Sequence, residues 1–159
     1  MELAPLRPEH LARVLDLNAE VARLTSPLDR EGLEQLASDS DLALVAGAGD
    51  AVLLAYTDAT ARPNPNVGWL REHIASFLYI DRVVVGPTLR GQGTGRRLYA
   101  AAEDWARDRA LAHLAAEVYL DPPNPASHGF HTALGFHAIG DASRSGKRIR
   151  YYAKPLAPL

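Results

Sequence analysis

A glycine-rich segment, "RGQGTG" at residues 90–95, has the residue types and spacing that most clearly indicate chemistry. It follows the apolar run "VVV" at 83–85, and a helical pattern begins at Gly95. Glycine lets the backbone approach a bulky anion closely, and the start of a helix presents free N–H groups and the positive end of its dipole. The segment therefore predicts a cradle for a phosphate or pyrophosphate group, to which Arg90 and Arg96 add positive charge.

Two common phosphate-binding motifs do not fit this segment. A P-loop requires Lys and then Ser or Thr after its last glycine, whereas Gly95 is followed by Arg96 and Arg97. A dinucleotide fingerprint requires a third glycine where Arg96 stands, and it usually lies in the first strand–helix unit of a chain. The segment by itself leaves a phosphate site and a glycine-rich turn without a ligand as alternatives.

The hydrophobic pattern around the segment predicts one domain over residues 1–159, built as a mixed α/β sheet with helices packed on it. We expect strands at 3–7, 77–85, 114–120, 135–140 and 147–156, a hairpin at 41–58, helices at 8–24, 26–40, 95–110 and 126–134, and a loop at 59–68. Strand 77–85, the helix after the glycines and strand 114–120 would form a right-handed crossover. The glycine segment then lies at the carboxyl end of a strand.

Two motifs at matching separation resemble the GNAT superfamily of N-acyltransferases. "RGQGTG" is similar to that superfamily's acyl-CoA pyrophosphate signature, R/Q-x-x-G-x-G/A. "NPASHGFHTALGF" at 124–136 resembles its later segment, in the positions of Asn124, Ser127, Phe130, Gly135 and Phe136. The resemblance covers about residues 77–136. It implies a GNAT-like fold, which is a mostly antiparallel sheet with splayed central parallel strands flanked by helices.

The resemblance implies that acetyl-CoA binds as the acyl-donor substrate. A strand holds the pantetheine arm through its backbone, the glycine loop holds the pyrophosphate, and Asn124 approaches the thiol end. The cofactor-binding residues implied are Val83, Val84, Val85, Arg90, Gly91, Gln92, Gly93, Thr94, Gly95, Arg96, Asn124, Ser127 and Phe130. The reaction implied is direct acetyl transfer to a primary amine of a small molecule, amino acid or peptide, without a covalent enzyme intermediate.

Two carboxylates are candidates for the base that such a transfer requires. Alternation in "LAAEVYL" at 114–120 puts Glu117 on the face opposite the apolar side chains. Glu117 also matches the glutamate of the "LEV" segment that is the base in some similar N-terminal acetyltransferases. Asp81 is the rival and is expected on the same face as Tyr79 and Val83. A water relay, or a structural carboxylate paired with an arginine, is the alternative to either.

His131 is the position where the sequence departs from the family pattern. Many GNAT enzymes have a tyrosine there, which acts as the acid toward the coenzyme A thiolate. An imidazolium can donate a proton near neutral pH, so His131 is predicted either to be the acid or to pack against the cofactor. Because the usual tyrosine is missing, a non-catalytic acyl-CoA-binding regulatory module is an alternative function for the protein. A plain nucleotide-phosphate binder is a third interpretation.

The composition excludes several other classes. The chain has no cysteine, so disulfides, thiolate zinc sites and cysteine acyl intermediates are excluded. The net charge of −2 gives no global attraction to nucleic acid. No histidine spacing fits a known metal motif, so we expect no metal.

The remaining expectations concern partners and location. No apolar stretch reaches the ~20 residues that span a bilayer, and the N-terminus lacks the features of a signal peptide, so we expect a cytoplasmic protein with no membrane partner. The acceptor is expected to be a small polar or amino-acid-like amine, bound by the first two helices, residues 59–76 and the C-terminal hairpin. We also expect a homodimer, for which the C-terminal strand offers a free edge.

Overall fold

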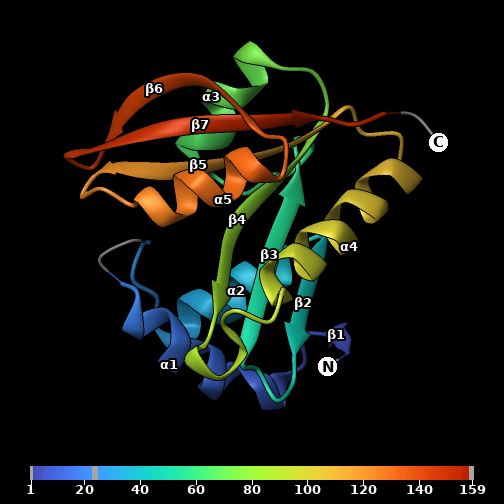
Figure 1. Ribbon diagram of the computed structural model, residues 1–159, viewed down its shortest axis with the longest axis vertical. Coiled ribbons are helices and arrows are strands. Elements are labelled where there is room, and N and C mark those ends of the chain that lie inside the picture. The colour runs from blue at the N-terminus through green and yellow to red at the C-terminus, as the bar shows by residue number, and fades with distance from the viewer. Residues whose placement is uncertain (1, 23–24, 158–159) are drawn as a thin grey trace.

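A single seven-stranded sheet with the order β1-β2-β3-β4-β5-β7-β6 organises the protein (Figure 1). This computed structural model describes residues 2–22 and 25–157. The strands are β1 Leu3–Pro5, β2 Leu42–Ala46, β3 Ala51–Thr57, β4 Phe77–Val85, β5 His113–Asp121, β6 His137–Arg144 and β7 Lys147–Pro155. The helices are α1 Leu11–Glu20, α2 Arg30–Asp39, α3 Pro65–His73, α4 Thr94–Asp108 and α5 Pro125–Ala133. Among the strands of the described residues, only β4 and β5 pair in parallel. The predicted fold class is confirmed.

Local sequence signals account for where the helices begin. The Asp29 side chain accepts a hydrogen bond from the Gly32 backbone N–H at 2.7 Å and so caps α2. The predicted loop at 59–68 is wrong from Pro65 onward, because Asn64 caps α3 and Pro65 takes its first position. The predicted helix at 8–24 begins with a 3₁₀ turn, α1 ends at Glu20, and the last two of these positions lie outside the described residues.

The sheet has a separate apolar core on each face. One core packs α1, α2 and α3 against the sheet, with buried residues such as Leu17, Leu33 and Leu70. The other core packs α4, through Leu98 and its neighbours on the same helix face. In Figure 1, α4 and α5 lie in front of the sheet, and α2 and α3 lie behind it. Helices therefore cover both faces of the sheet.

The sheet opens between β4 and β5. Their pairing covers only Phe77–Tyr79 against His113–Ala115, and beyond these residues the two strands diverge. The predicted splay is therefore confirmed. Between Ile80 and Val85 the edge of β4 that faces away from β3 has no pairing with β5, because the ladder has already ended.

A β-bulge in β4 corrects one prediction about its faces. Arg82 pairs with Leu54 and Ile80 pairs with Ala55, so Asp81 is an extra residue in β4. The bulge shifts the alternation of the strand by one residue. Tyr79 consequently packs in the core that holds α1, whereas Val83 packs against the core that holds α4. The expectation that Asp81 shares a face with Val83 is wrong.

The C-terminal strand is internal to the sheet. β7 pairs with β5 on one side and with β6 on the other, so the two outer strands are β1 and β6. The prediction that the C-terminal strand offers a free edge for dimer formation is therefore wrong. Across the described ranges, 2–22 and 25–157, no helix has the length and apolar character needed to cross a membrane.

Candidate active site

A cavity of about 1050 Å³ occupies the region where β4 and β5 separate. It is lined by both strands, by residues 25–27 that precede α2, by the start of α5, and by the turn between β6 and β7. Asp81 and Glu117 are the two acidic side chains in this lining. The structure therefore brings the two predicted base candidates into one cavity.

The glycine loop joins this cavity to the start of α4. Gly91 and Gly93 both have φ = +76°, a conformation that favours glycine. The N-cap residue of α4 is Gly93, which has no side chain to cap the first turn, so the N–H groups of this turn keep their capacity to bind an anion. A Cβ atom on Gly95 would lie 3.2 Å from Cζ of Phe130. The loop thus has the glycines that its conformation and its packing against α5 require.

The predicted cofactor-binding residues form a continuous path from α4 to the divergent strands. Val83, Val84, Val85, Arg90, Gly91, Asn124, Ser127 and Phe130 line the cavity. Gln92, Gly93, Thr94, Gly95 and Arg96 continue from this lining through the loop into α4. The Asn124 side chain accepts a hydrogen bond from the Ser127 backbone N–H at 3.3 Å and caps α5. Its approach to a thiol stays a prediction.

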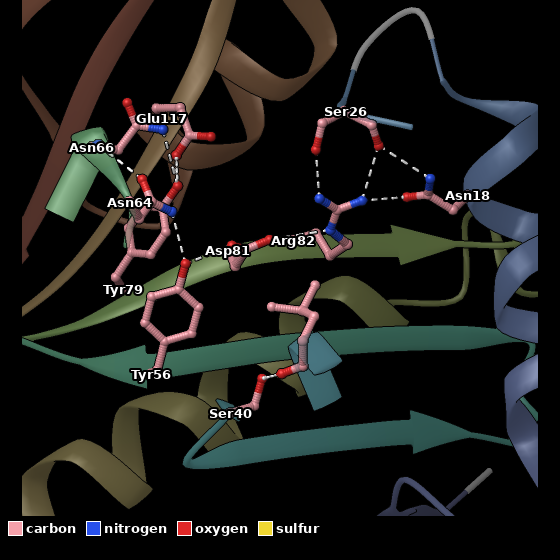
Figure 2. Close-up of polar contacts among 11 residues, drawn as sticks. Asn18, Ser26, Ser40, Tyr56, Asn64, Asn66, Tyr79, Asp81, Arg82 and Glu117 are labelled. Atoms are coloured by element: carbon pink, nitrogen blue, oxygen red, sulfur yellow. Dashed lines mark hydrogen bonds and ion pairs between the residues drawn. The ribbon is translucent and has the colours of Figure 1, made fainter. Parts of the chain in front are cut away.

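Glu117 ends a chain of hydrogen bonds at the wall of the cavity, of which Figure 2 shows Asn66, Tyr79 and Glu117. The Tyr79 hydroxyl donates to Glu117 Oε2 at 2.5 Å, and Asn66 Nδ2 donates to the Tyr79 oxygen at 3.3 Å. The Tyr151 hydroxyl donates to Asn66 Oδ1 at 2.6 Å. Burial raises the pKa of Glu117 to about 8, although the Tyr79 hydrogen bond lowers it, and the charge of Asp81 raises it. Such a carboxyl group exchanges a proton near neutral pH.

Asp81 has a different environment, in which both carboxylate oxygens have partners. The Tyr56 hydroxyl donates to Oδ2 at 2.7 Å, and Arg82 Nε donates to Oδ1 at 3.1 Å. Asn64 Nδ2 donates to the Tyr56 oxygen at 2.7 Å. Asp81 therefore has the partners of a structural, ion-paired carboxylate.

The same arginine fastens the segment before α2 to β4. Arg82 is 8% exposed. Its Nη1 donates to Asn18 Oδ1 at 2.8 Å and to the Ser26 carbonyl at 3.0 Å, and its Nη2 contacts the Ser26 hydroxyl at 2.6 Å (Figure 2). These bonds hold Ser26, and with it this wall of the cavity, against β4.

His131 is buried at 3% exposure, and both its ring nitrogens are occupied. Nδ1 lies 2.7 Å from the Ser127 carbonyl oxygen, which can only accept, so Nδ1 carries the proton. Burial lowers the pKa of His131, so the ring is neutral near pH 7. Nε2 then accepts from the Tyr99 hydroxyl at 2.7 Å. If His131 were the acid itself, it would need an N–H that is free to face the cavity. Both ring nitrogens already have hydrogen-bond partners, so the geometry does not favour this role.

Comparison with known proteins identifies the family of this fold. The family model described as "Acetyltransferase (GNAT) family" matches residues 13–136. The chain belongs to the GNAT family. Aminoglycoside N(6')-acetyltransferase type 1 of Klebsiella aerogenes is 31% identical over 114 residues, which are 71% of this chain and 66% of that enzyme. The enzyme of the same name from Salmonella typhimurium is 27% identical over 78% of this chain and 77% of its own.

The relatives differ in how much of their length is matched. This GNAT chain spans 46% of the aminoglycoside N(6')-acetyltransferase type 1 of Stenotrophomonas maltophilia, at 30% identity over half of its own length. Solved structures support the fold. Naa20 of Chaetomium thermophilum, in complex with a bisubstrate analogue, has a TM-score of 0.78 at 20% identity and covers 98% of this chain and 87% of its own. The ribosomal-protein-S18-alanine N-acetyltransferase of Escherichia coli has a TM-score of 0.71 at 16% identity, with coverage of 99% and 95%.

Several side chains of this GNAT site were not predicted from the sequence. Tyr79 of β4 contacts Glu117, Asn66 of α3 contacts Tyr79, and Tyr99 of α4 contacts His131. The β4–β5 register pairs Tyr79 with Ala115, two residues before Glu117, so no spacing in the sequence indicates the contact between Tyr79 and Glu117. Among the described residues, no three His, Cys, Asp or Glu side chains gather in a way that suits a metal ion.

Proposed function

We propose that this GNAT protein is an acetyl-CoA-dependent N-acetyltransferase acting on a primary amine of a small molecule, amino acid or peptide. The observation that supports this most directly is Glu117, whose carboxyl group lies in the cavity between the divergent strands with a pKa of about 8. A carboxylate with this pKa is a stronger base than an ordinary glutamate, and its basic form prevails above about pH 8. The relatives named as aminoglycoside acetyltransferases support amine acetylation of a small molecule.

The donor substrate fits the path of the predicted binding residues. The uncapped first turn of α4 and the Gly91–Gly95 loop suit a pyrophosphate. The edge of β4 beyond Tyr79 has backbone groups that suit the amides of a pantetheine arm. Acetyl-CoA supplies a thioester carbonyl, which an amine nitrogen can attack. These features favour an acyl-CoA over a mononucleotide, which has no extended arm to pair with β4.

Glu117 is proposed as the base and Asp81 as a structural carboxylate. The Glu117 carboxylate accepts the proton of the amine as its nitrogen bonds to the thioester carbon, and backbone N–H groups of the β4 edge stabilise the negative oxygen. The C–S bond then breaks, and the thiolate gains one proton for the one that the amine has lost. Asp81 influences this step through its charge and through Arg82.

Tyr99 is the side chain through which His131 reaches the cavity. Its hydroxyl lies 2.7 Å from His131 Nε2, and both residues line the cavity. We propose that His131 orients this hydroxyl by accepting its hydrogen, and that the hydroxyl oxygen is the group presented to the thiol. In this proposal His131 is not the acid that the sequence suggested, but a residue that positions Tyr99.

Thiol release from acetyl-CoA with a panel of amines tests the proposal. Glu117→Gln is expected to lower kcat by about 10²–10⁴-fold, as loss of a general base does, while the dissociation constant of coenzyme A stays within about twofold. Full turnover by Glu117→Gln would move the base role to Asp81 or to a water relay.

Binding measurements separate the other two interpretations. Tight coenzyme A binding without thiol release from any amine would indicate a non-catalytic acyl-CoA-binding module. Stronger thermal stabilisation by ATP or NAD than by coenzyme A would indicate a nucleotide-phosphate binder. A cytoplasmic location and a homodimer stay predictions, to be tested by fractionation and by light scattering.

A further inference from the structure

The turn between β6 and β7 brings two cations to the cavity. Ser145 and Gly146 have φ = +51° and +76°, and they form the tight turn between Arg144 and Lys147. Arg144 and Lys147 are directly opposite each other in the β6–β7 ladder, so their side chains leave the same face of the hairpin. Both line the cavity. Like charges directly opposite each other destabilise a strand pair, so this placement costs free energy unless an anion compensates it.

Neither cation has a carboxylate partner within residues 2–22 and 25–157. Arg144 Nη1 donates to the adjacent Ser143 carbonyl at 2.9 Å, while Arg144 Nε is buried without a hydrogen-bond partner. Lys147 Nζ lies 5.5 Å from the centre of the Tyr119 ring. A buried guanidinium N–H without a partner is costly, and an acceptor oxygen from a ligand would satisfy it.

The acidic groups of the cavity do not offset these charges near neutral pH. Asp81 is already paired with Arg82. Glu117 is largely protonated at pH 7, because burial raises its pKa to about 8. Arg90, the remaining cation of the lining, lies at the glycine loop and donates to the Val85 carbonyl at 3.1 Å. The part of the cavity beyond Glu117 is therefore positive, which disfavours a polycationic acceptor.

Arg144 also lies near the proposed base. Glu117 is directly opposite Tyr151 in the β5–β7 ladder. Burial raises the pKa of the Tyr151 hydroxyl, the Arg144 guanidinium lowers it, and the Glu117 charge raises it, so both groups lie close to this hydroxyl. Glu117 and Arg144 line the same cavity, so an acceptor whose amine lies at Glu117 can extend within it toward Arg144.

We propose that Arg144 and Lys147 form an anion subsite that selects an amine carrying a carboxylate, such as an α-amino acid, and not a polycation. This inference rests on the proposed N-acetyltransferase activity and gives its acceptor class. It differs from the acceptor in the printed name of the relatives, since an aminoglycoside carries several ammonium groups and no carboxylate.

Kinetics with matched acceptors test the subsite. The wild-type protein, Arg144→Gln and Lys147→Gln are assayed with α-amino acids, with their carboxamides and with kanamycin. Arg144→Gln is expected to raise KM for amino acids by about tenfold or more, as loss of a hydrogen bond to a charge does, and to leave KM for carboxamides within about twofold. Arg148→Gln is the matched control, because Arg148 is 63% exposed on the same hairpin and outside the cavity lining.

A second measurement does not depend on turnover. N-acetyl-α-amino acids and their carboxamides are titrated by calorimetry into the protein in the presence of coenzyme A. Because their amines are acetylated, amine protonation does not affect the result. Tighter binding of the carboxylates, lost in Arg144→Gln and kept in Arg148→Gln, is the expected result. Equal binding of both series, or equal loss in both variants, would overturn the subsite. Turnover of carboxamides or kanamycin in preference to amino acids would overturn it too, while leaving the N-acetyltransferase proposal intact.

Discussion

Substitutions of Tyr79 and Asp81 should move the pH–rate profile in opposite directions. Both act on the pKa of Glu117, which the Tyr79 hydrogen bond lowers and the Asp81 charge raises. In the wild-type protein the carboxylate is the basic form and its pKa is about 8, so kcat/KM should rise about tenfold per pH unit below pH 7 and level off above about pH 8.5.

Tyr79→Phe removes a 2.5 Å hydrogen bond to the carboxylate. Hydrogen bonds to charged groups contribute about 1.5–3 kcal/mol, and one pKa unit corresponds to about 1.4 kcal/mol. The apparent pKa should therefore rise by about one to two units. At pH 7 this lowers kcat/KM by about tenfold or more, and the loss should shrink as the pH approaches about 10, because more of the base is then ionised.

Asp81→Asn removes a negative charge and leaves Arg82 in place. The Glu117 carboxylate then forms more easily, so the apparent pKa should fall and the rate at pH 6 should rise relative to the plateau. The assay is thiol release across pH 5.5–10, about two units either side of the Glu117 pKa, with circular dichroism as the check on folding. A wild-type profile that is flat over this range, or a shift of both variants in the same direction, would refute the assignment of Glu117 as the base.

Three further outcomes are expected. His131→Phe should lower kcat by about tenfold without moving the Glu117 limb of the profile, because the hydroxyl it holds loses its acceptor; unchanged kcat would mean that His131 only packs. Gly86→Ala should destabilise the fold by about 1–3 kcal/mol in urea titrations, because its Cβ would lie 2.7 Å from the Asp50 carbonyl oxygen, whereas Gly68→Ala, with open space around the new Cβ, should cost nothing. Glu117→Gln should raise the melting temperature relative to wild type more at pH 9 than at pH 5, since the raised pKa makes native stability fall as pH rises from about 4.5 through about 8; an equal effect at both pH values would contradict a buried, proton-binding Glu117.

Elements with strong local patterns were predictable from the sequence. Strand 77–85 matches β4 at both ends, because its apolar run is bounded by breaks that the sequence displays. Residues 65–68 were interpreted as loop because proline and asparagine disrupt regular structure. The same two residue types start a helix when Asn precedes Pro at its first position, as Asn64 and Pro65 do in α3.

The contacts of the site depend on tertiary structure and were less predictable. The bulge at Asp81 is set by pairing with β3, so the alternation of β4 gave the wrong face for Val83. The position of Glu117 in its strand made it a candidate base. Its raised pKa, however, results from burial in the folded sheet, where its partner Tyr79 is 38 residues away in the sequence. The pairing of Tyr99 with His131 joins α4 to α5, and no spacing in the sequence indicates it.

The short ladder between β4 and β5 makes the sheet two antiparallel ribbons joined at a narrow hinge. One ribbon is β1 to β4, the other is β5, β7 and β6, and three residue pairs connect them. Any small rotation at Leu78 is enlarged along Ile80–Val85, because these residues extend away from the joint. The packing of side chains around this joint therefore sets the angle between the two ribbons, and with it the width of the cavity between them, without contact with the reacting atoms.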